Sequence, residues 1–528
     1  MNGHAPSQHT LTCEENMVLL DEKSPSDIES EAGRADLSSR FSPPSSSPHP
    51  TTLRQPRSLV LRTVIFLLPS FLQPRGGSVP PRLSPTAYLD GMRGLAALFV
   101  FFCHYTYTCY VIAHGYGYEP PLRPPPTTPT PNNFALLKLP FLRLFYSGPP
   151  MVCVFFVISG YALSLRPLTQ IRSRQFSSLS ATLSSLIFRR AIRLFLPCAV
   201  STLLIVAMAR IGLYEWTREF AYDEAYMRNV QETHFRSGGK EASLRGQVAE
   251  WAGMLFEFVH VWDWEAFGGS TGIDVHLWTI PVEFRASMFV FLGVAGLSRL
   301  KAKWRFLGLA GLGLFAFRSA RWEVMLFYWG VGLAEVDAGR WWMRDKPALG
   351  EEKEKKRNIR GGRESKHWKS FWAALSVLGL YLMSQPDYGS DETPGWVFLT
   401  GIIPGWWKDG HRFWQSFGAM LFVLAVGRSR GWQRLFESSM VQYLGRISYA
   451  MYLMHGPVLH TVGYAIERWV WTNVTGIETL RAYNAGFALA SVFVVPIVIW
   501  VSDVFWRGVD APVVKFAKRV EGFCSISE

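Results

Sequence analysis

Charged residues are scarce in this chain of 528 residues. Asp, Glu, Lys and Arg together make up 18% of it, whereas roughly 25% is usual for soluble domains. Aromatic residues, by contrast, reach 15%, with 21 Trp and 37 Phe. Helices that face lipid and carry aromatic side chains at the membrane surface have this composition. The composition therefore predicts an integral membrane protein rather than a soluble enzyme.

Cysteine is also rare, and its spacing is uninformative. The chain has six cysteines, with no C-x-x-C pair and no metal-type spacing. Four lie in apolar segments and two near the chain ends: Cys103, Cys109, Cys153, Cys198, Cys13 and Cys524. This pattern argues against a disulfide framework and against a zinc site. We therefore expect no bound metal, and no bound cofactor.

The formal net charge of +13 raises the question of nucleic-acid binding. The Lys and Arg residues, however, cluster in short segments between apolar runs, as expected for the cytosolic loops of membrane proteins. A basic face on a soluble module, which nucleic-acid binding requires, is not apparent. We expect membrane lipid as a partner and no nucleic acid.

The chain also lacks a signal peptide and an internal repeat. Its first 55 residues are rich in Ser, Pro and charge, which is typical of disorder. An apolar stretch at 59–72 is interrupted by Arg62 and Pro69, so we expect an interfacial helix rather than a span. The predicted organisation is a disordered tail at 1–55, an interfacial amphipathic segment and linker at 56–85, a transmembrane domain at 86–510, and a short cytosolic C-terminal tail at 511–528.

The remaining apolar segments predict an all-α membrane protein built as a bundle of about ten transmembrane helices. These segments lie near 87–113, 146–165, 187–211, 275–297, 304–320, 322–336, 370–385, 412–428, 440–464 and 484–507. The loops that follow the even-numbered segments are basic, including the run Glu351–Arg357 after the sixth. The positive-inside rule then predicts that both termini are cytosolic. An Asn473-Val-Thr475 glycosylation sequon falls in an outer loop.

The first segment carries two ionisable residues in an apolar context, Arg93 and His104. They are eleven positions apart, which at about 100° per residue places them on one helix face, separated by about 16 Å along the axis. Burying Arg in hydrocarbon costs about 2.5–3.5 kcal/mol on insertion scales, so such residues usually line a functional cavity. The alternative is that Arg93 anchors the helix end and His104 is a packing residue.

The segment Leu89-Asp-Gly-Met-Arg93, followed by Cys103-His-Tyr105, resembles the first span of the type 3 acyltransferase family. Four further elements resemble that family in the same order along residues 86–510. They are Val154–Leu163, Arg190-Ala-Ile-Arg193, Leu277-Trp-Thr-Ile-Pro-Val-Glu283 and Ser448–Pro457. Thr-Ile before Glu283 departs from the family's Ser-Leu, and a long segment at 212–270 intervenes.

This resemblance implies transfer of an acyl group from acyl-CoA to a hydroxyl-bearing acceptor: a small metabolite, a carbohydrate or a lipid. His104 would act as the general base, because imidazole titrates near neutral pH, or would form an acyl-His intermediate. Arg93 cannot act as a base, so its expected role is electrostatic, and we favour donor binding. Arg190 and Arg193 share a helix face and could bind the phosphates of CoA; ordinary membrane anchoring is the alternative.

Glu283 completes the predicted catalytic set, either paired with an Arg of the site or orienting a His. A purely structural ion pair with a neighbour such as Arg285 is the other interpretation. His455, Tyr452 and Trp278 are predicted to line the substrate site. His455 is equally compatible with helix packing, whereas Tyr and Trp at such positions are more often core or interface aromatics than substrate contacts. A different class of function also fits these intramembrane charges: a transporter or flippase with an Arg/His/Glu relay. Release of free CoA by the purified protein would distinguish the enzyme from the transporter.

Overall fold

The computed structural model describes residues 59–73, 83–118, 134–236, 243–262, 272–345 and 366–526. In these residues the chain is helical, without a β-strand; an isolated bridge pairs His114 with Tyr388. The predicted disordered tail at 1–55 and the charged run at 351–357 lie outside the described residues. The chain divides into two compact units, Met1–Ala87 and Tyr88–Glu528.

The first unit contains helix α2 (Leu59–Leu67), where an interfacial helix was predicted. Its apolar side chains are largely exposed: Val60, Leu61, Val64, Phe66 and Leu67. The side-chain amide of Gln73 donates to the carbonyl oxygens of Ile65 and Leu68, which satisfies acceptors at the helix end.

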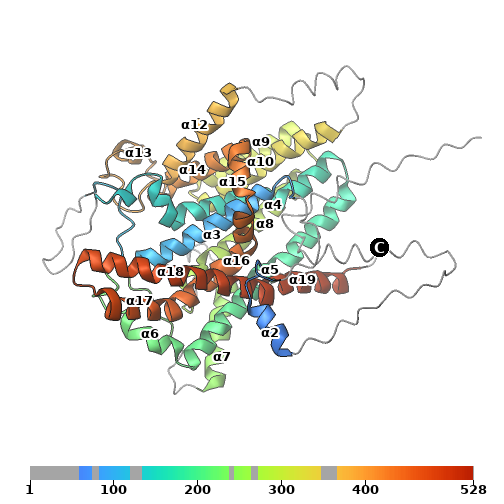
Figure 1. Ribbon diagram of the computed structural model, residues 1–528. Coiled ribbons are helices and arrows are strands. Elements are labelled where there is room, and N and C mark those ends of the chain that lie inside the picture. The colour runs from blue at the N-terminus through green and yellow to red at the C-terminus, as the bar shows by residue number, and fades with distance from the viewer. Residues whose placement is uncertain are drawn as a thin grey trace, which may run out of the picture. The chain divides into compact units, whose positions relative to one another are not determined.

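In the second unit, each of the ten predicted apolar segments coincides with a helix (Figure 1). They are α3 (Ala87–Tyr107), α4 (Gly148–Arg172), α5 (Phe176–Arg210), α8 (Thr279–Leu297), α9 (Ala302–Arg318), α10 (Trp322–Asp345), α12 (Lys366–Met383), α14 (Gly410–Val426), α16 (Ser439–Val458) and α18 (Leu480–Phe505). Shorter helices connect them: η2 (Leu136–Lys138), η3 (Leu142–Tyr146), α6 (Leu213–Ala221), α7 (Leu244–Val259), η4 (Val275–Trp278), α13 (Val397–Gly401), α15 (Arg430–Phe436), η5 (Leu459–Gly463), α17 (Tyr464–Val470), η6 (Trp471–Thr475), η7 (Trp506–Asp510) and α19 (Ala511–Cys524). Helix α19 occupies most of the segment assigned to a C-terminal tail.

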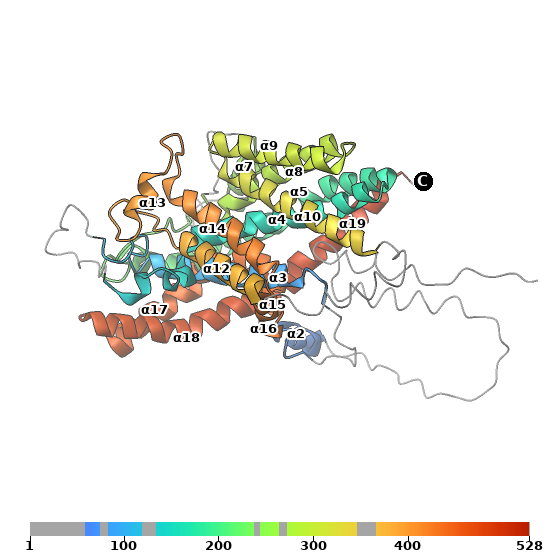
Figure 2. The ribbon, with the colours of Figure 1, turned by 90° about the horizontal axis from the view of Figure 1, so that it is seen from above.

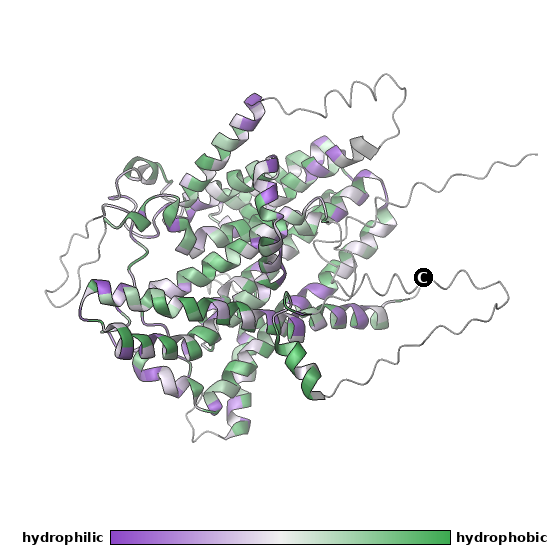
Figure 3. Ribbon diagram, viewed as in Figure 1, coloured by the Kyte–Doolittle hydropathy of each residue, from purple (hydrophilic) through white to green (hydrophobic). Residues whose placement is uncertain are grey.

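Four helical stretches of the described chain are long and apolar enough to cross a membrane. They are Gly148–Arg172, Phe176–Arg210, Val275–Leu297 and Leu480–Cys524, and apolar residues cover much of their length (Figure 3). Among the other segments, α9 and α14 have 17 residues each, which is at the short end for a span. The composition and these four helices indicate a membrane protein.

Glycines let α3 approach its neighbours closely. A Cβ on Gly94 would lie 2.3 Å from the backbone nitrogen of Gly445 in α16, and one on Gly91 would lie 2.0 Å from the carbonyl oxygen of Phe436. Small residues permit this kind of backbone contact between membrane helices. The contact fixes α3, which carries both Arg93 and His104, against α16.

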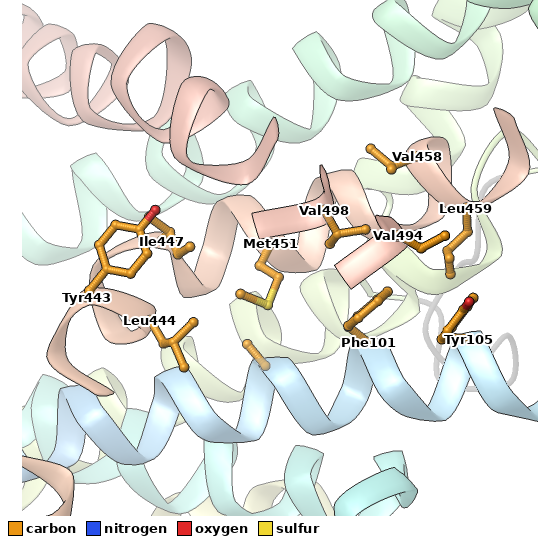
Figure 4. Close-up of a cluster of buried hydrophobic side chains, with 11 residues drawn as sticks. Phe101, Tyr105, Tyr443, Leu444, Ile447, Met451, Val458, Leu459, Val494 and Val498 are labelled. Atoms are coloured by element: carbon orange, nitrogen blue, oxygen red, sulfur yellow. The ribbon is translucent and has the colours of Figure 1, made fainter. Parts of the chain in front are cut away.

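A buried apolar cluster continues the contact between α3 and α16 (Figure 4). From α3 it includes Ala97, Phe101 and Tyr105, which recur every four residues and therefore share one helix face. Figure 4 shows Phe101 and Tyr105 directed toward the residues that α16, η5 and α18 contribute: Tyr443, Leu444, Ile447, Met451, Val458, Leu459, Val494 and Val498. This packing positions the C-terminal end of α3, where His104 lies.

Candidate active site

His104 lies near the C-terminal end of α3, in a group of buried histidines and carboxylates. Its ring centroid is 4.2 Å from that of His276 in η4 and 5.1 Å from that of His455 in α16. Its Nδ1 atom is buried without a hydrogen-bond partner, 3.8 Å from Oε1 of Glu232. The side chain as a whole is 21% exposed. We call His104, Glu232, His234, Asp274, His276, His455 and His460 the histidine cluster.

Glu232 connects two of these histidines. This carboxylate, on the segment after α6, lies 2.7 Å through Oε1 from Nε2 of His276 and 2.6 Å through Oε2 from Nε2 of His460. On the other side of His276, Nδ1 is 2.7 Å from Oδ1 of Asp274. An ionised carboxylate only accepts hydrogen bonds, so both ring nitrogens of His276 carry hydrogen and the ring is an imidazolium.

Both carboxylates are ionised at neutral pH. Burial alone would raise the pKa of Glu232, but the charge of His276 and the hydrogen bonds from His276 and His460 outweigh it and hold the pKa well below its usual range. Burial opposes ionisation of Asp274 as well, and the charge and hydrogen bond of His276 again lower the pKa. The cluster is thus an arrangement of opposite charges in a buried setting.

His460 extends the cluster to His234. The Nε2 atom of His234 donates to the carbonyl oxygen of Tyr214 at 2.6 Å, and its Nδ1 lies 3.0 Å from Nδ1 of His460. Burial lowers the pKa of His234 to about 3, so this ring is neutral and its Nδ1 accepts. His460 therefore bridges the two residues, with Nδ1 facing His234 and Nε2 facing Glu232.

His455 has a fixed tautomer. Its Nδ1 donates to the carbonyl oxygen of Met451 at 3.1 Å, which leaves Nε2 with a lone pair, and that atom is buried without a hydrogen-bond partner. One ring nitrogen from each of His104, His276 and His455 lies within 4.8 Å of the others. Three imidazoles can bind Zn²⁺, but here the carboxylates occupy both nitrogens of His276. A cation at this point would have to displace Glu232 or Asp274 from His276.

Arg93 is not part of this cluster. Its guanidinium is 3.6 Å from Asp90 and about one-third exposed. Arg93 and Arg193 both lie within electrostatic range of Asp510 in η7. The structure therefore brings Arg93 and Arg193, two residues predicted to bind the donor, to the same carboxylate.

Glu283 lies in another polar group, formed by α4, α5 and α8. Its Oε1 accepts hydrogen bonds from Arg190 at 2.8 Å and from Ser159 at 3.0 Å. Arg190 also donates through Nε to Ser287 at 3.1 Å. Glu283 is thus paired with Arg190, one of the arginines predicted to bind the donor. Among the described residues, the hydrogen-bond partners of Glu283 include no histidine.

The two predicted aromatic lining residues hold neighbouring elements in place. The hydroxyl of Tyr452 donates to the carbonyl oxygen of His276 and accepts from Thr279 at 2.6 Å. Tyr452 thus fixes η4, which carries His276. Trp278 packs against the Arg412 guanidinium, at 4.8 Å from the ring centroid, in a cation–π contact.

Sequence reasoning missed five members of the histidine cluster: Glu232, His234, Asp274, His276 and His460. Asp274 and His276 directly precede the Leu277–Glu283 element, which was the available signal. Glu232 and His234 lie in the polar segment at 212–270, where an acid or a histidine is unremarkable. The role of Glu232 depends on its contacts with His276 and His460, which lie 44 and 228 positions further along the chain.

A family model described as an acyltransferase domain matches residues 86–507. Three curated proteins are similar over most of their length. They are O-acetyltransferase PaAT-1 of Phomopsis amygdali, with 29% identity over 83% of this chain and 84% of that protein; acyltransferase R4 of a Phoma strain, with 28% identity over 85% and 98%; and acyltransferase clz18 of Cochliobolus lunatus, with 28% identity over 83% and 96%. No solved structure matches.

Proposed function

Because the chain belongs to the acyltransferase 3 family, and is thus an acyltransferase, we propose that it moves an acyl group from acyl-CoA to a hydroxyl group of its acceptor, with His104 as general base. The observation that carries this role is the partly exposed His104 side chain, held beside the buried carboxylate of Glu232. The name of one relative, an O-acetyltransferase, supports an acetyl donor and an oxygen acceptor. Family membership gives no support to a transporter or flippase.

In the proposed reaction His104 takes the proton of the acceptor hydroxyl as its oxygen attacks the thioester carbonyl. The new C–O bond forms, the C–S bond breaks, and CoA leaves as a thiolate that recovers the proton. The Glu232 carboxylate, 3.8 Å from Nδ1 of His104, would stabilise the imidazolium formed during attack. An acyl-His intermediate is the variant, with the same residues in place.

Donor binding is proposed at the group formed by Arg93, Arg193 and Arg190. Arg93 and Arg193 both lie within electrostatic range of Asp510, which supports their grouping. Guanidinium groups bind phosphate oxygens in bidentate fashion. Arg93 and His104 lie about 16 Å apart along α3, a separation that the extended pantetheine arm of CoA would bridge. Arg190 with Glu283 would form the wall of this donor site.

The ten predicted spans and the cytosolic termini belong to the same proposal. Four helices support it by length and composition, and the basic loops support the orientation. In this topology Arg93 faces the cytosol, where CoA is found, and His104 lies beyond the middle of the membrane. His455 would then line the acceptor side of the site, since its ring is 5.1 Å from His104.

The decisive experiment uses the purified protein with acetyl-CoA and a panel of hydroxyl-bearing acceptors. We expect acceptor-dependent release of free CoA and an acceptor that gains one acetyl group by mass spectrometry. His104→Ala should abolish both while the protein remains in the membrane at normal abundance. Undiminished turnover by this variant would remove His104 as the base. His367→Ala, which changes an exposed histidine on α12, is the matched control.

A further inference from the structure

A small cavity of about 60 Å³ lies apart from the residues of the histidine cluster. It is enclosed by η2, η3 and the chain that follows α12. Its polar and aromatic lining consists of Tyr116, Lys138, Arg143, Ser384, Thr393 and Trp396. One water needs about 10–15 Å³ of such volume. The cavity therefore accommodates a group of a few non-hydrogen atoms.

Arg143 is the more deeply buried of the two cationic lining residues, with 1% of its surface exposed. Its Nη2 atom donates to the carbonyl oxygens of Ile112 and Ala113, at 3.3 and 3.4 Å. Its Nε and Nη1 atoms are buried without a hydrogen-bond partner. Buried donors of a charged group are normally satisfied, because leaving them unpaired costs about 1–3 kcal/mol or more.

The carboxylate near Arg143 does not supply the missing contacts. Asp387 is 3.9 Å from Nη2 of Arg143 and accepts a 2.8 Å hydrogen bond from Gln415. Its side chain is partly exposed, unlike that of Arg143. A contact of 3.9 Å is too long for a hydrogen bond, so the guanidinium is only partly compensated.

A second cation, Lys138, lies beside the same cavity. Lys138 is buried, and burial together with the charge of Arg143 lowers the pKa of its ammonium to about 8. Burial and the charges of Lys138 and Arg143 also lower the pKa of His114. Burial is the larger cause of both shifts, and the neighbouring positive charges add to it.

We propose that this cavity is a binding site for a short-chain carboxylate such as acetate or formate, held by Arg143 and Lys138. A carboxylate offers the paired acceptor oxygens that a guanidinium binds best, and these would satisfy the unpaired Nε and Nη1 donors of Arg143. The volume limits the ligand to a few heavy atoms. The site uses no residue of the proposed acyl-transfer machinery, so the two assignments stand or fall separately.

The test is equilibrium binding of radiolabelled acetate to the full-length protein in detergent, at constant ionic strength in sulfate. We expect saturable binding of one acetate per chain, with at least a tenfold loss of affinity in Arg143→Gln. Lys138→Gln should weaken binding without abolishing it. The matched control is Arg236→Gln, which changes an arginine with 67% side-chain exposure and should bind as the wild type does.

Three further outcomes decide the assignment. Absence of saturable binding to the wild type, or equal affinity in Arg143→Gln, would overturn it. Tighter binding of chloride, measured by displacement of acetate, would also overturn the carboxylate assignment in favour of a halide site. If Arg143→Gln does not fold, Lys138→Gln carries the test. Because His104→Ala leaves the cavity intact, it should bind acetate normally, even where it abolishes acyl transfer.

Discussion

Glu232 is the residue on which the charge balance of the histidine cluster depends. It contacts the imidazolium of His276 through one oxygen and His460 through the other, and it lies beside His104. Removing one partner of a buried, hydrogen-bonded ion pair leaves an uncompensated charge, which commonly costs about 3–5 kcal/mol. The carboxylate is therefore expected to matter for both the geometry and the basicity of the cluster.

Replacing Glu232 with Gln should lower kcat for acyl transfer by about 10²-fold or more, since general base catalysis contributes about 10²–10⁴-fold. KM for acyl-CoA should change little, because the proposed donor arginines are untouched. Glu232→Asp should recover part of the rate. The measurement is steady-state release of CoA, with Glu219→Gln as the control on an exposed position of α6. An unchanged kcat would contradict the proposed role of Glu232.

His234 predicts how stability changes with pH. Its pKa is about 3 in the folded protein and about 6.5 in an unfolded chain. Between these values the unfolded state binds more protons, so the free energy of unfolding falls as the pH drops below 6.5. From pH 7.5 to 5.5 this residue alone should remove about 1.4 kcal/mol.

The measurement is the midpoint of thermal unfolding in detergent across this pH range. In His234→Gln, the unfolding midpoint should fall less as the pH drops, because the contribution of His234 is gone. This variant should nevertheless be less stable than the wild type at neutral pH, because it loses the hydrogen bond with His460. His367→Gln, on an exposed position, should decline as the wild type does. Parallel curves for the wild type and His234→Gln would show that the folded protein protonates this ring as readily as the unfolded chain.

Among the elements, the contact between α3 and α16 decides where Arg93 and His104 lie. Gly94→Ala would place a Cβ 2.3 Å from the backbone of Gly445, which has no flexible end that can move aside. Overpacking of this kind costs about 1–3 kcal/mol. We therefore expect a lower unfolding midpoint and reduced acyl transfer. The control is Gly311→Ala, in which the added Cβ meets open space on α9, so its stability should be unchanged. Equal effects of Gly94→Ala and Gly311→Ala on the unfolding midpoint would contradict a close backbone contact at Gly94.

The elements also show how far sequence reasoning reached. Long apolar runs predicted all ten long helices, because hydropathy over the length of a membrane span is a strong signal. Hydropathy did not predict α6 and α7, which lie in the polar segment at 212–270. His104 and His455 stood out because an ionisable residue is unusual in an apolar run. Glu232 did not, since its importance arises from the folded arrangement around η4 and η5.

At the scale of the whole molecule, the orientation in the membrane determines which side the proposed donor site faces and which side the acceptor site faces. Basic loops predict cytosolic termini, with Arg93 toward the cytosol. The cysteines provide a direct test, because among the described residues four are buried or half-buried and only Cys524 is exposed. Cys13, which lies outside the described residues, must be replaced by Ser so that it does not contribute.

In sealed microsomes, whose outer face is cytosolic, a membrane-impermeant maleimide should label Cys524 of the Cys13→Ser protein without detergent. The opposite face is tested by adding Val474→Cys to the Cys13→Ser, Cys524→Ser protein, because Val474 is exposed on η6, beside Asn473 of the sequon. That thiol should react only after detergent opens the vesicles. Since an even number of spans returns the chain to the side on which it began, labelling of Cys524 only after detergent would invert the topology. It would also place Arg93 on the side away from cytosolic CoA, and the proposed donor site would then have to be abandoned.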